Sequence, residues 1–182
     1  MIDQNLVLFE SNPDFADNSR ALYDYIVENT NLKTFWVVKD PAMLEPMRAA
    51  GVDCDIENSD RAIAMEQCAH YLVTSSFMFA YNKRPGQIHV SAWHGFGPKT
   101  IGFDEDAASE SSALRDLKVI TTQCDLLTTT SRVSQLMMAG MLSMDPRKVM
   151  NSGFPRNDYL FTTDGRKLLE DALGVDLSLI HI

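Results

Sequence analysis

An α/β fold built on a mainly parallel sheet is predicted by three features of this 182-residue sequence. Short apolar runs alternate with amphipathic segments of helix length, and polar loops that contain glycine or proline separate them. In addition, 45% of the residues are hydrophobic, which is enough to build a core. Strands that alternate with helices imply crossover connections and parallel pairing. We therefore expect a Rossmann-like domain with three layers, in which helices cover both faces of one sheet.

In the first half of the sequence, runs of apolar, aromatic and β-branched residues predict strands, and apolar residues at helical spacing predict helices between them. Asn18 is expected to cap the first helix, and Pro41 is expected to open the second. The predicted strands are residues 6–9, 34–38, 53–56 and 71–74.

The second half continues the alternation. The predicted strands are residues 88–93, 126–129 and 148–150, and the predicted helices are residues 114–124, 133–142 and 164–173. Gly174 is expected to end the last helix, because glycine readily adopts the left-handed conformation at that position. Methionines at helical spacing in and after the 133–142 helix are expected to pack in the core, namely Met137, Met138, Met141 and Met144.

The charge balance and the cysteines restrict the class of protein. The sequence has 16 Lys and Arg residues and 25 Asp and Glu residues, so its formal net charge is -9. This acidic balance argues against a nucleic-acid partner bound through overall charge. The three cysteines are far apart and form no C-x-x-C pair, as expected for reduced thiols. The N-terminal segment has no signal-peptide pattern, and no apolar run is long enough to cross a bilayer. We expect a cytoplasmic domain.

No resident metal or cofactor is expected. The four histidines show no H-x-x-x-H spacing, and the sequence lacks the glycine pattern of a dinucleotide-binding loop. His70 and His89 adjoin apolar strands, where a histidine is usually structural.

The strongest predicted site follows the strand at residues 88–93, in the sequence Trp93-His94-Gly95-Phe96-Gly97-Pro98-Lys99. Ligands of parallel sheets bind at the carboxyl ends of the strands. An imidazole there suits general acid or base chemistry at neutral pH. Gly95 permits close approach of a substrate, and Lys99 offers a donor to an anionic group. The alternative is a tight turn in which His94 is only hydrogen-bonded to backbone.

A second candidate site is the loop at residues 152–158, which presents Arg156 and Asn157 at the same edge of the sheet. The guanidinium of Arg156 has two possible roles. It binds a phosphate through two donors, or it pairs with Asp158 and locks the loop.

The loop at residues 10–18 is a third candidate. Asp14, Asp17 or Asn18 could cap the first helix, whose N-terminus would favour an anion.

Three blocks of sequence, in this order, resemble the CDP-glycerol glycerophosphotransferase family, which includes the teichoic acid primases and polymerases of bacterial cell-wall synthesis. The resemblance covers about residues 6–161. The blocks are Leu8-Phe9-Glu10-Ser11 with Asp17-Asn18 and Trp36-Val37-Val38-Lys39; Gly86-Gln87 leading to Trp93-His94-Gly95, Lys99 and Ile101-Gly102-Phe103-Asp104; and Ser152-Gly153-Phe154-Pro155-Arg156-Asn157-Asp158.

The resemblance implies the N-terminal, acceptor-side half of a two-domain GT-B transferase. That family transfers glycerol phosphate from CDP-glycerol to a lipid-linked or polymeric acceptor hydroxyl and releases CMP. His94 matches the family's essential histidine, which implies a base for the acceptor hydroxyl, while Gly95, Lys99, Arg156 and Asn157 would bind substrate. The donor would be held mainly by a second domain, and membrane contact would be peripheral, at the inner face of the cell membrane.

One departure from the family pattern concerns the acceptor. The family usually continues His-Gly-Thr-Pro-Leu-Lys, whereas this sequence has Phe96-Gly97-Pro98 between Gly95 and Lys99. The missing threonine hydroxyl leaves open a different acceptor or a related polyol phosphate.

The predicted organisation has three parts. Residues 1–161 form the acceptor-side domain, residues 162–176 form a helix that leads toward a donor domain, and residues 177–182 match what a transposase adapter of sequencing libraries encodes in this frame. We expect the chain alone to be inactive. Two alternatives stay open, a GT-B glycosyltransferase that uses a nucleotide sugar and a non-catalytic α/β binding domain.

Overall fold

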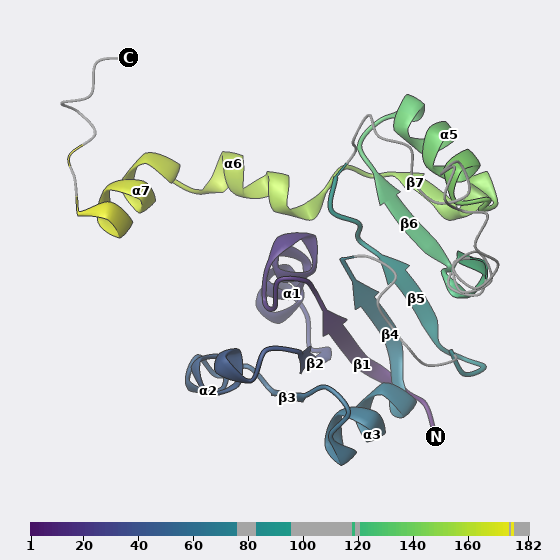
Figure 1. Cartoon of the computed structure of the whole chain (residues 1–182), viewed down its shortest axis with the longest axis horizontal. Helices are drawn as coiled ribbons and strands as arrows, with labels where there is room; N and C mark the ends of the chain where they lie inside the picture. Colours follow the sequence, from purple (N-terminus) through teal and green to yellow (C-terminus); the bar gives the residue numbers. More distant parts are fainter. Residues whose placement is uncertain (76–82, 96–117, 119–120, 175, 177–182) are drawn as a thin grey trace.

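The computed structural model describes residues 1–75, 83–95, 118, 121–174 and 176. Its strands form one seven-stranded sheet in the order β3-β2-β1-β4-β5-β6-β7, and every neighbouring pair is parallel (Figure 1). This confirms the predicted α/β class. The strands are β1 (Asp3–Glu10), β2 (Lys33–Val38), β3 (Cys54–Ile56), β4 (Ala69–Thr74), β5 (Ile88–Ser91), β6 (Leu126–Thr129) and β7 (Val149–Asn151).

In the described part of the chain, four helices connect strands, as the crossover pattern predicts, namely α1 (Asp17–Asn29), α2 (Pro41–Ala49), α3 (Asp60–Cys68) and α5 (Arg132–Met141), the last followed by the short 3-10 helix η3 (Pro146–Lys148). After β7 come the 3-10 helix η4 (Pro155–Asp158), α6 (Tyr159–Thr162) and α7 (Gly165–Leu173). Polar side chains start several of them. Asp40, Ser59 and Ser131 each accept a hydrogen bond from a backbone N–H in the first turn of α2, α3 and α5.

The predicted cap of the first helix is wrong. Ala16 occupies the N-cap position of α1, and Asn18 lies inside the first turn with a fully buried side chain. The Asn18 amide donates to carbonyls beyond β5 instead of to its own helix, so a distant partner overrides the local capping preference.

The two faces of the sheet have separate hydrophobic cores, as the alternation of strand side chains requires. Phe9 and Trp36 lie on one face, where their rings stack at 5.4 Å and where α1 and α2 supply Tyr23 and Met47. Leu8 and Phe35 point the other way and pack with Ala62 of α3. Helices therefore cover both faces, which gives three layers.

A further core joins α5 to β6 and β7. It contains Leu127, Met138, Met144 and Val149, all of them buried. Met138, Met141 and Met144 are buried as predicted, whereas Met137 is 40% exposed. The helix therefore turns most of its methionine stripe toward the sheet.

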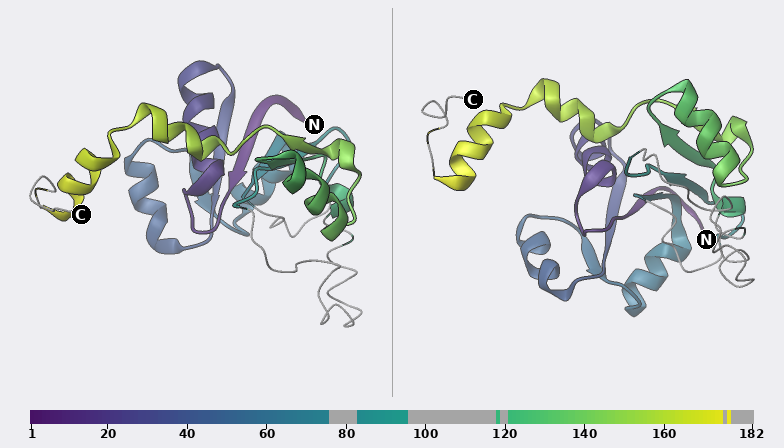
Figure 2. Two further views of the ribbon diagram at one scale, coloured as in Figure 1. Left: turned by 90° about the horizontal axis from the view of Figure 1, so that it is seen from above. Right: turned by 45° about the horizontal axis from the view of Figure 1, so that its top comes forward.

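The last helix extends away from the sheet (Figures 1 and 2). α7 matches the helix predicted at residues 164–173, and Gly174 ends it with φ of 63°, as expected. Asp164 is the N-cap of α7, and its side chain accepts a hydrogen bond from the Lys167 N–H. The apolar side chains of α7 are exposed, namely Leu168, Leu169 and Leu173.

Some predictions lie outside the described residues. They concern Lys99, most of the helix predicted at residues 114–124, and the tail at residues 177–182. Residues 121–123, at the end of that predicted helix, are helical. None of the helices in the described part of the chain combines the length and apolar composition that a bilayer crossing needs.

Candidate functional site

The predicted site lies near the point where the strand order changes direction. From β1 the chain first adds β2 and β3 on one side and then β4 and β5 on the other. In open α/β sheets, ligands bind outside the carboxyl ends of the strands at such a point. Residues that follow β1, β4, β5 and β7 contact one another at this edge, as the hydrogen bonds described next show.

The backbone contact of the His94 imidazole favours one tautomer. Its Nδ1 lies 3.1 Å from the carbonyl oxygen of Ser75, the residue after β4. Because a carbonyl oxygen only accepts, Nδ1 carries the hydrogen, and in the neutral ring Nε2 keeps its lone pair. The side chain is exposed, and its ring stacks on that of Trp93 with centroids 4.4 Å apart. His94 therefore makes the backbone hydrogen bond that a structural histidine would make. The same bond leaves the lone pair on Nε2, where it can act as a base.

The turn that carries His94 comprises residues 92–95, hereafter the His94 turn. β5 ends at Ser91, two residues before the predicted end. The Ala92 N–H still donates to Thr74 O, but among the described residues the Ala92 carbonyl accepts from side chains and not from a strand. Trp93 has φ of 50°, a backbone conformation that is rare for an aromatic residue. Side chains from other elements hold the carbonyls of this turn. Asn18 Nδ2 donates to Ala92 O at 3.1 Å and to Trp93 O at 2.8 Å.

Arg156 joins the loop after β7 to the same turn. Its guanidinium forms an ion pair with Asp17 through Nη1 and donates from Nη2 to His94 O at 2.8 Å. The predicted pairing with Asp158 is therefore wrong, since the loop is locked through Asp17. The partner stands at the start of α1, which local sequence spacing does not reveal. The side chain is 38% exposed, and the predicted contact with phosphate stays a prediction.

The other predicted substrate-binding residues are placed differently. Gly95 has φ of 157°, and a Cβ built there would lie 4.0 Å from Arg156 Nη2. Asn157 is exposed and lines a separate groove beside α1. Lys99 lies outside the described residues. The structure thus brings His94, Gly95 and Arg156 together.

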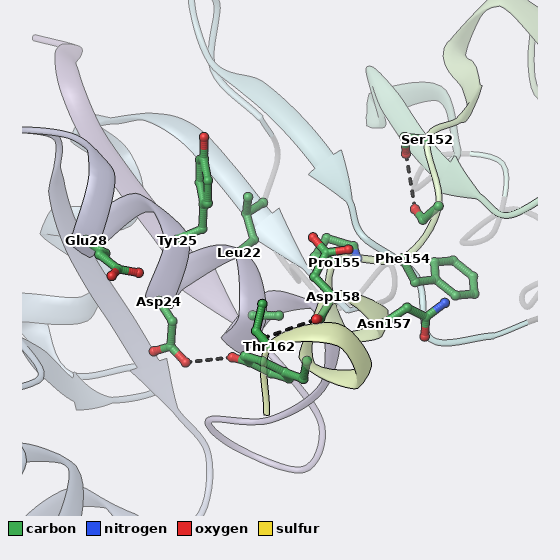
Figure 3. A pocket seen from close by; sticks show the side chains of 13 residues that line it. Leu22, Asp24, Tyr25, Glu28, Ser152, Phe154, Pro155, Asn157, Asp158 and Thr162 are labelled. Atoms are coloured by element: carbon green, nitrogen blue, oxygen red, sulfur yellow. Dashed lines mark hydrogen bonds between the residues drawn. The ribbon is translucent and has the colours of Figure 1, made fainter. Parts of the chain in front are cut away.

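The groove beside α1 has a volume of about 540 Å³ and runs between α1, η4 and α6 (Figure 3). Three carboxylates line it, from Asp24, Glu28 and Asp158. Tyr159 Oη donates to Asp24 Oδ2 at 2.7 Å, and burial together with this carboxylate raises the pKa of Tyr159 to about 12. Asp24 is paired with Arg20, but the carboxylates of Glu28 and Asp158 still disfavour a phosphate, so this groove is a poor candidate for the donor or acceptor phosphates.

The first loop uses its acids differently from the prediction. Asp14 Oδ2 accepts from the N–H groups of Lys39 and Asp40, so this side chain supports the start of α2 and not of α1. At the start of α1, the Asp17 carboxylate accepts from the Asn18 N–H at 2.7 Å. Asp17 thus places a carboxylate where the sequence led us to expect an external anion.

A buried ion pair near the same edge was not predicted. Glu10, the last residue of β1, is 1% exposed and pairs with the Lys39 ammonium group after β2. Burial raises the pKa of the Glu10 carboxyl, while the Lys39 charge opposes that shift. The sequence does contain a signal for this pair, because Glu10 directly follows the apolar run at residues 6–9.

The described residues contain no group of three or more His, Cys, Asp or Glu side chains placed to hold a metal ion. The chemistry available from them is that of an exposed imidazole bonded to the backbone through Nδ1, a nearby guanidinium, and a glycine that leaves the backbone accessible.

Comparison with known proteins identifies the family. The family model described as CDP-Glycerol:Poly(glycerophosphate) glycerophosphotransferase matches residues 1–179. The chain is 24% identical over 166 residues to the teichoic acid glycerol-phosphate transferase of Staphylococcus aureus, covering 87% of this chain and 42% of that protein. It is 22% identical over 182 residues to the teichoic acid poly(glycerol phosphate) polymerase of Staphylococcus epidermidis, covering 95% of this chain and 25% of that protein.

Solved structures agree on the fold. A histidine-to-alanine variant of the wall teichoic acid polymerase TagF superimposes with a TM-score of 0.80 at 21% identity, covering 98% of this chain and 45% of that one. A histidine-to-asparagine TagF variant soaked with CDPG gives a TM-score of 0.83 at 21% identity, covering 99% and 46%. The chain thus spans less than half the length of these relatives. It belongs to the CDP-glycerol:poly(glycerophosphate) glycerophosphotransferase family.

Proposed function

We propose that this chain is the acceptor-side domain of a transferase that moves glycerol phosphate, or a related polyol phosphate, from a CDP-activated donor to an acceptor hydroxyl. The acceptor is of the teichoic-acid or capsular type, either lipid-linked or polymeric. The observation that carries the proposal is the exposed His94 at the carboxyl edge of the sheet, with Nδ1 on the Ser75 carbonyl and Nε2 available as a base. The names of the relatives support the donor and the polymer class.

The reaction places a proton transfer at His94 Nε2. The acceptor oxygen attacks the phosphorus that carries the glycerol, while Nε2 takes the proton from that hydroxyl. The bond between this phosphorus and the bridging oxygen of the diphosphate breaks, and CMP leaves with the bonding electrons. A new phosphodiester links the glycerol phosphate to the acceptor.

The other predicted residues would bind substrate around this base. Gly95 leaves the backbone open to close approach, and Lys99 supplies a positive charge for a phosphate. Arg156 and Asn157 stand on the loop after β7, where the guanidinium of Arg156 lies beside His94 O and Asn157 lines the groove beside α1. Their contact with substrate is part of the proposal.

The donor nucleotide is held mainly by a second domain in this proposal, toward which α6 and α7 lead. The exposed leucines of α7 support that direction, because an apolar face in contact with further protein would be covered. We place the whole enzyme in the cytoplasm with peripheral contact at the inner face of the cell membrane, where lipid-linked acceptors are accessible.

The test is His94→Ala in the full-length protein, assayed for CMP release from CDP-glycerol with a teichoic-acid-type acceptor. A general base contributes about 100- to 10,000-fold, so turnover should fall by that factor. His70→Ala is the matched control, since His70 bonds the Gly86 carbonyl at the far end of β4. Near-normal turnover of the His94 variant, or preference for a nucleotide sugar over CDP-glycerol, would overturn the proposal.

A further inference from the structure

Asn18 is a buried polar residue whose side-chain amide is bonded at both ends. Its Nδ2 donates to Ala92 O and Trp93 O, and its Oδ1 accepts from the Arg156 N–H at 3.2 Å. Two carbonyl acceptors on one side and an N–H donor on the other fix which way the amide points. The side chain has no exposed surface, so these contacts are not shared with bulk solvent.

The contacts of Asn18 belong to a larger pattern. Three successive carbonyls of the His94 turn each accept from a side chain of another element. Ala92 O also accepts from Thr128 Oγ1 at 2.7 Å, and His94 O accepts from Arg156 Nη2. Fixing the carbonyls fixes the peptide planes on both sides of Trp93 and the plane that follows His94.

This fixation acts on an unusual backbone. Trp93 has φ of 50°, where a bulky L-residue is strained unless its surroundings hold it. Without the two Asn18 donors, the turn can relax toward an ordinary conformation, and the His94 ring would then move away from Ser75 O. The tautomer that exposes the Nε2 lone pair depends on that contact.

We infer that Asn18 is a positioning residue that holds the His94 turn, and through it the orientation and tautomer of the catalytic imidazole. The inference rests on the proposed role of His94 as the base. Asn18 touches no reacting atom in this scheme. It acts through the backbone of Ala92 and Trp93, and Arg156 and Thr128 support the same turn.

The test replaces Asn18 by Asp, which has nearly the same shape but cannot donate to the two carbonyls. In the 182-residue chain, the 15N shifts of the His94 ring should change from an Nδ1–H pattern to a mixture of tautomers. In the full-length enzyme, kcat should fall by about 10- to 100-fold with little change in the KM for CDP-glycerol, as expected from a misplaced catalytic group. Asn29→Asp, at the exposed end of the same helix, is the matched control and should change neither quantity.

A milder variant covers the case in which Asn18→Asp does not fold. Thr128→Val keeps the side-chain shape and removes one donor to Ala92 O. It should shift the His94 ring signals in the same direction by a smaller amount, with cooperative urea unfolding retained. An Nε2–H tautomer in the unmodified chain, or unchanged ring signals in a folded Asn18→Asp chain, would overturn the inference.

The activity measurements separate this inference from the proposed function. Unchanged kcat in Asn18→Asp beside an inactive His94→Ala enzyme would overturn the positioning role alone. Unchanged kcat in both variants would instead overturn the proposed role of His94.

Discussion

Gly95 tests whether the backbone of the His94 turn requires a glycine, and Gly140 of α5 serves as the comparison. Gly95 has φ of 157°, which only glycine adopts readily, whereas Gly140 lies inside α5 where a Cβ would meet nothing within 4 Å. Gly95→Ala should therefore cost about 1–3 kcal/mol of the free energy of unfolding. Gly140→Ala should stabilise the chain by about 0.5–1 kcal/mol, since alanine is the better helix former. Urea titrations measure both, and a loss of stability in Gly140→Ala as large as in Gly95→Ala would contradict the argument.

A buried histidine predicts a loss of stability in acid. His89 is 4% exposed, and burial, followed by the nearby Lys83 charge, lowers its pKa from 6.5 to about 4. Between these values the unfolded chain binds the proton and the folded chain does not, so stability is present above pH 6.5 and falls as the pH drops toward 4. The full effect is about 3 kcal/mol.

His89→Gln checks this sign, because glutamine keeps a polar side chain near Thr74 but does not titrate. The stability advantage of the unmodified chain over His89→Gln should shrink by about 3 kcal/mol between pH 7 and pH 4 in urea titrations. His70→Gln serves as the control for a partly exposed histidine. A difference that stays constant with pH would contradict the prediction.

At the scale of elements, α7 and β6 each contain a leucine, and the two leucines differ in burial. Leu173 of α7 is 61% exposed, whereas Leu127 of β6 is fully buried in the core with α5. Leu127→Ala should cost about 2–5 kcal/mol, while Leu173→Ala should stay within about 0.5 kcal/mol of the unmodified chain. Thermal or urea unfolding of the two variants measures this, and a large cost at Leu173 would show that α7 packs on the domain in solution.

The element patterns also explain which parts of the fold were predictable. Buried strands such as β2 and amphipathic helices such as α5 were found because the periodicity of apolar side chains acts over a few residues. The end of β5 was placed two residues too late, since Ala92 and Trp93 are as apolar as a strand requires. In the described part of the structure their carbonyls accept from the side chains of Asn18 and Thr128 and not from a neighbouring strand.

At the scale of the whole molecule, the chain should release negligible CMP from CDP-glycerol on its own. It spans 42% of one relative and about 45% of the TagF structures, and in the proposed enzyme the donor is held mainly by a second domain. A coupled assay of CMP release, with the full-length protein as the positive control, measures this. Turnover by the 182-residue chain at a rate comparable with the full-length protein would show that the donor site lies within it.

The amino-acid sequence by itself determined the parallel α/β class, the family, and the place of His94 beyond the end of a strand. These rest on local patterns, because side-chain periodicity and short motifs depend on neighbours along the chain. Only the tertiary structure decided that Asn18 bonds the His94 turn and does not cap α1, and that Arg156 pairs with Asp17 and not Asp158. The two residues of the Asn18–Trp93 contact are separated by 75 positions in the sequence, and those of the Arg156–Asp17 contact by 139. These contacts therefore form only when the sheet has assembled and the loops at its carboxyl edge lie side by side.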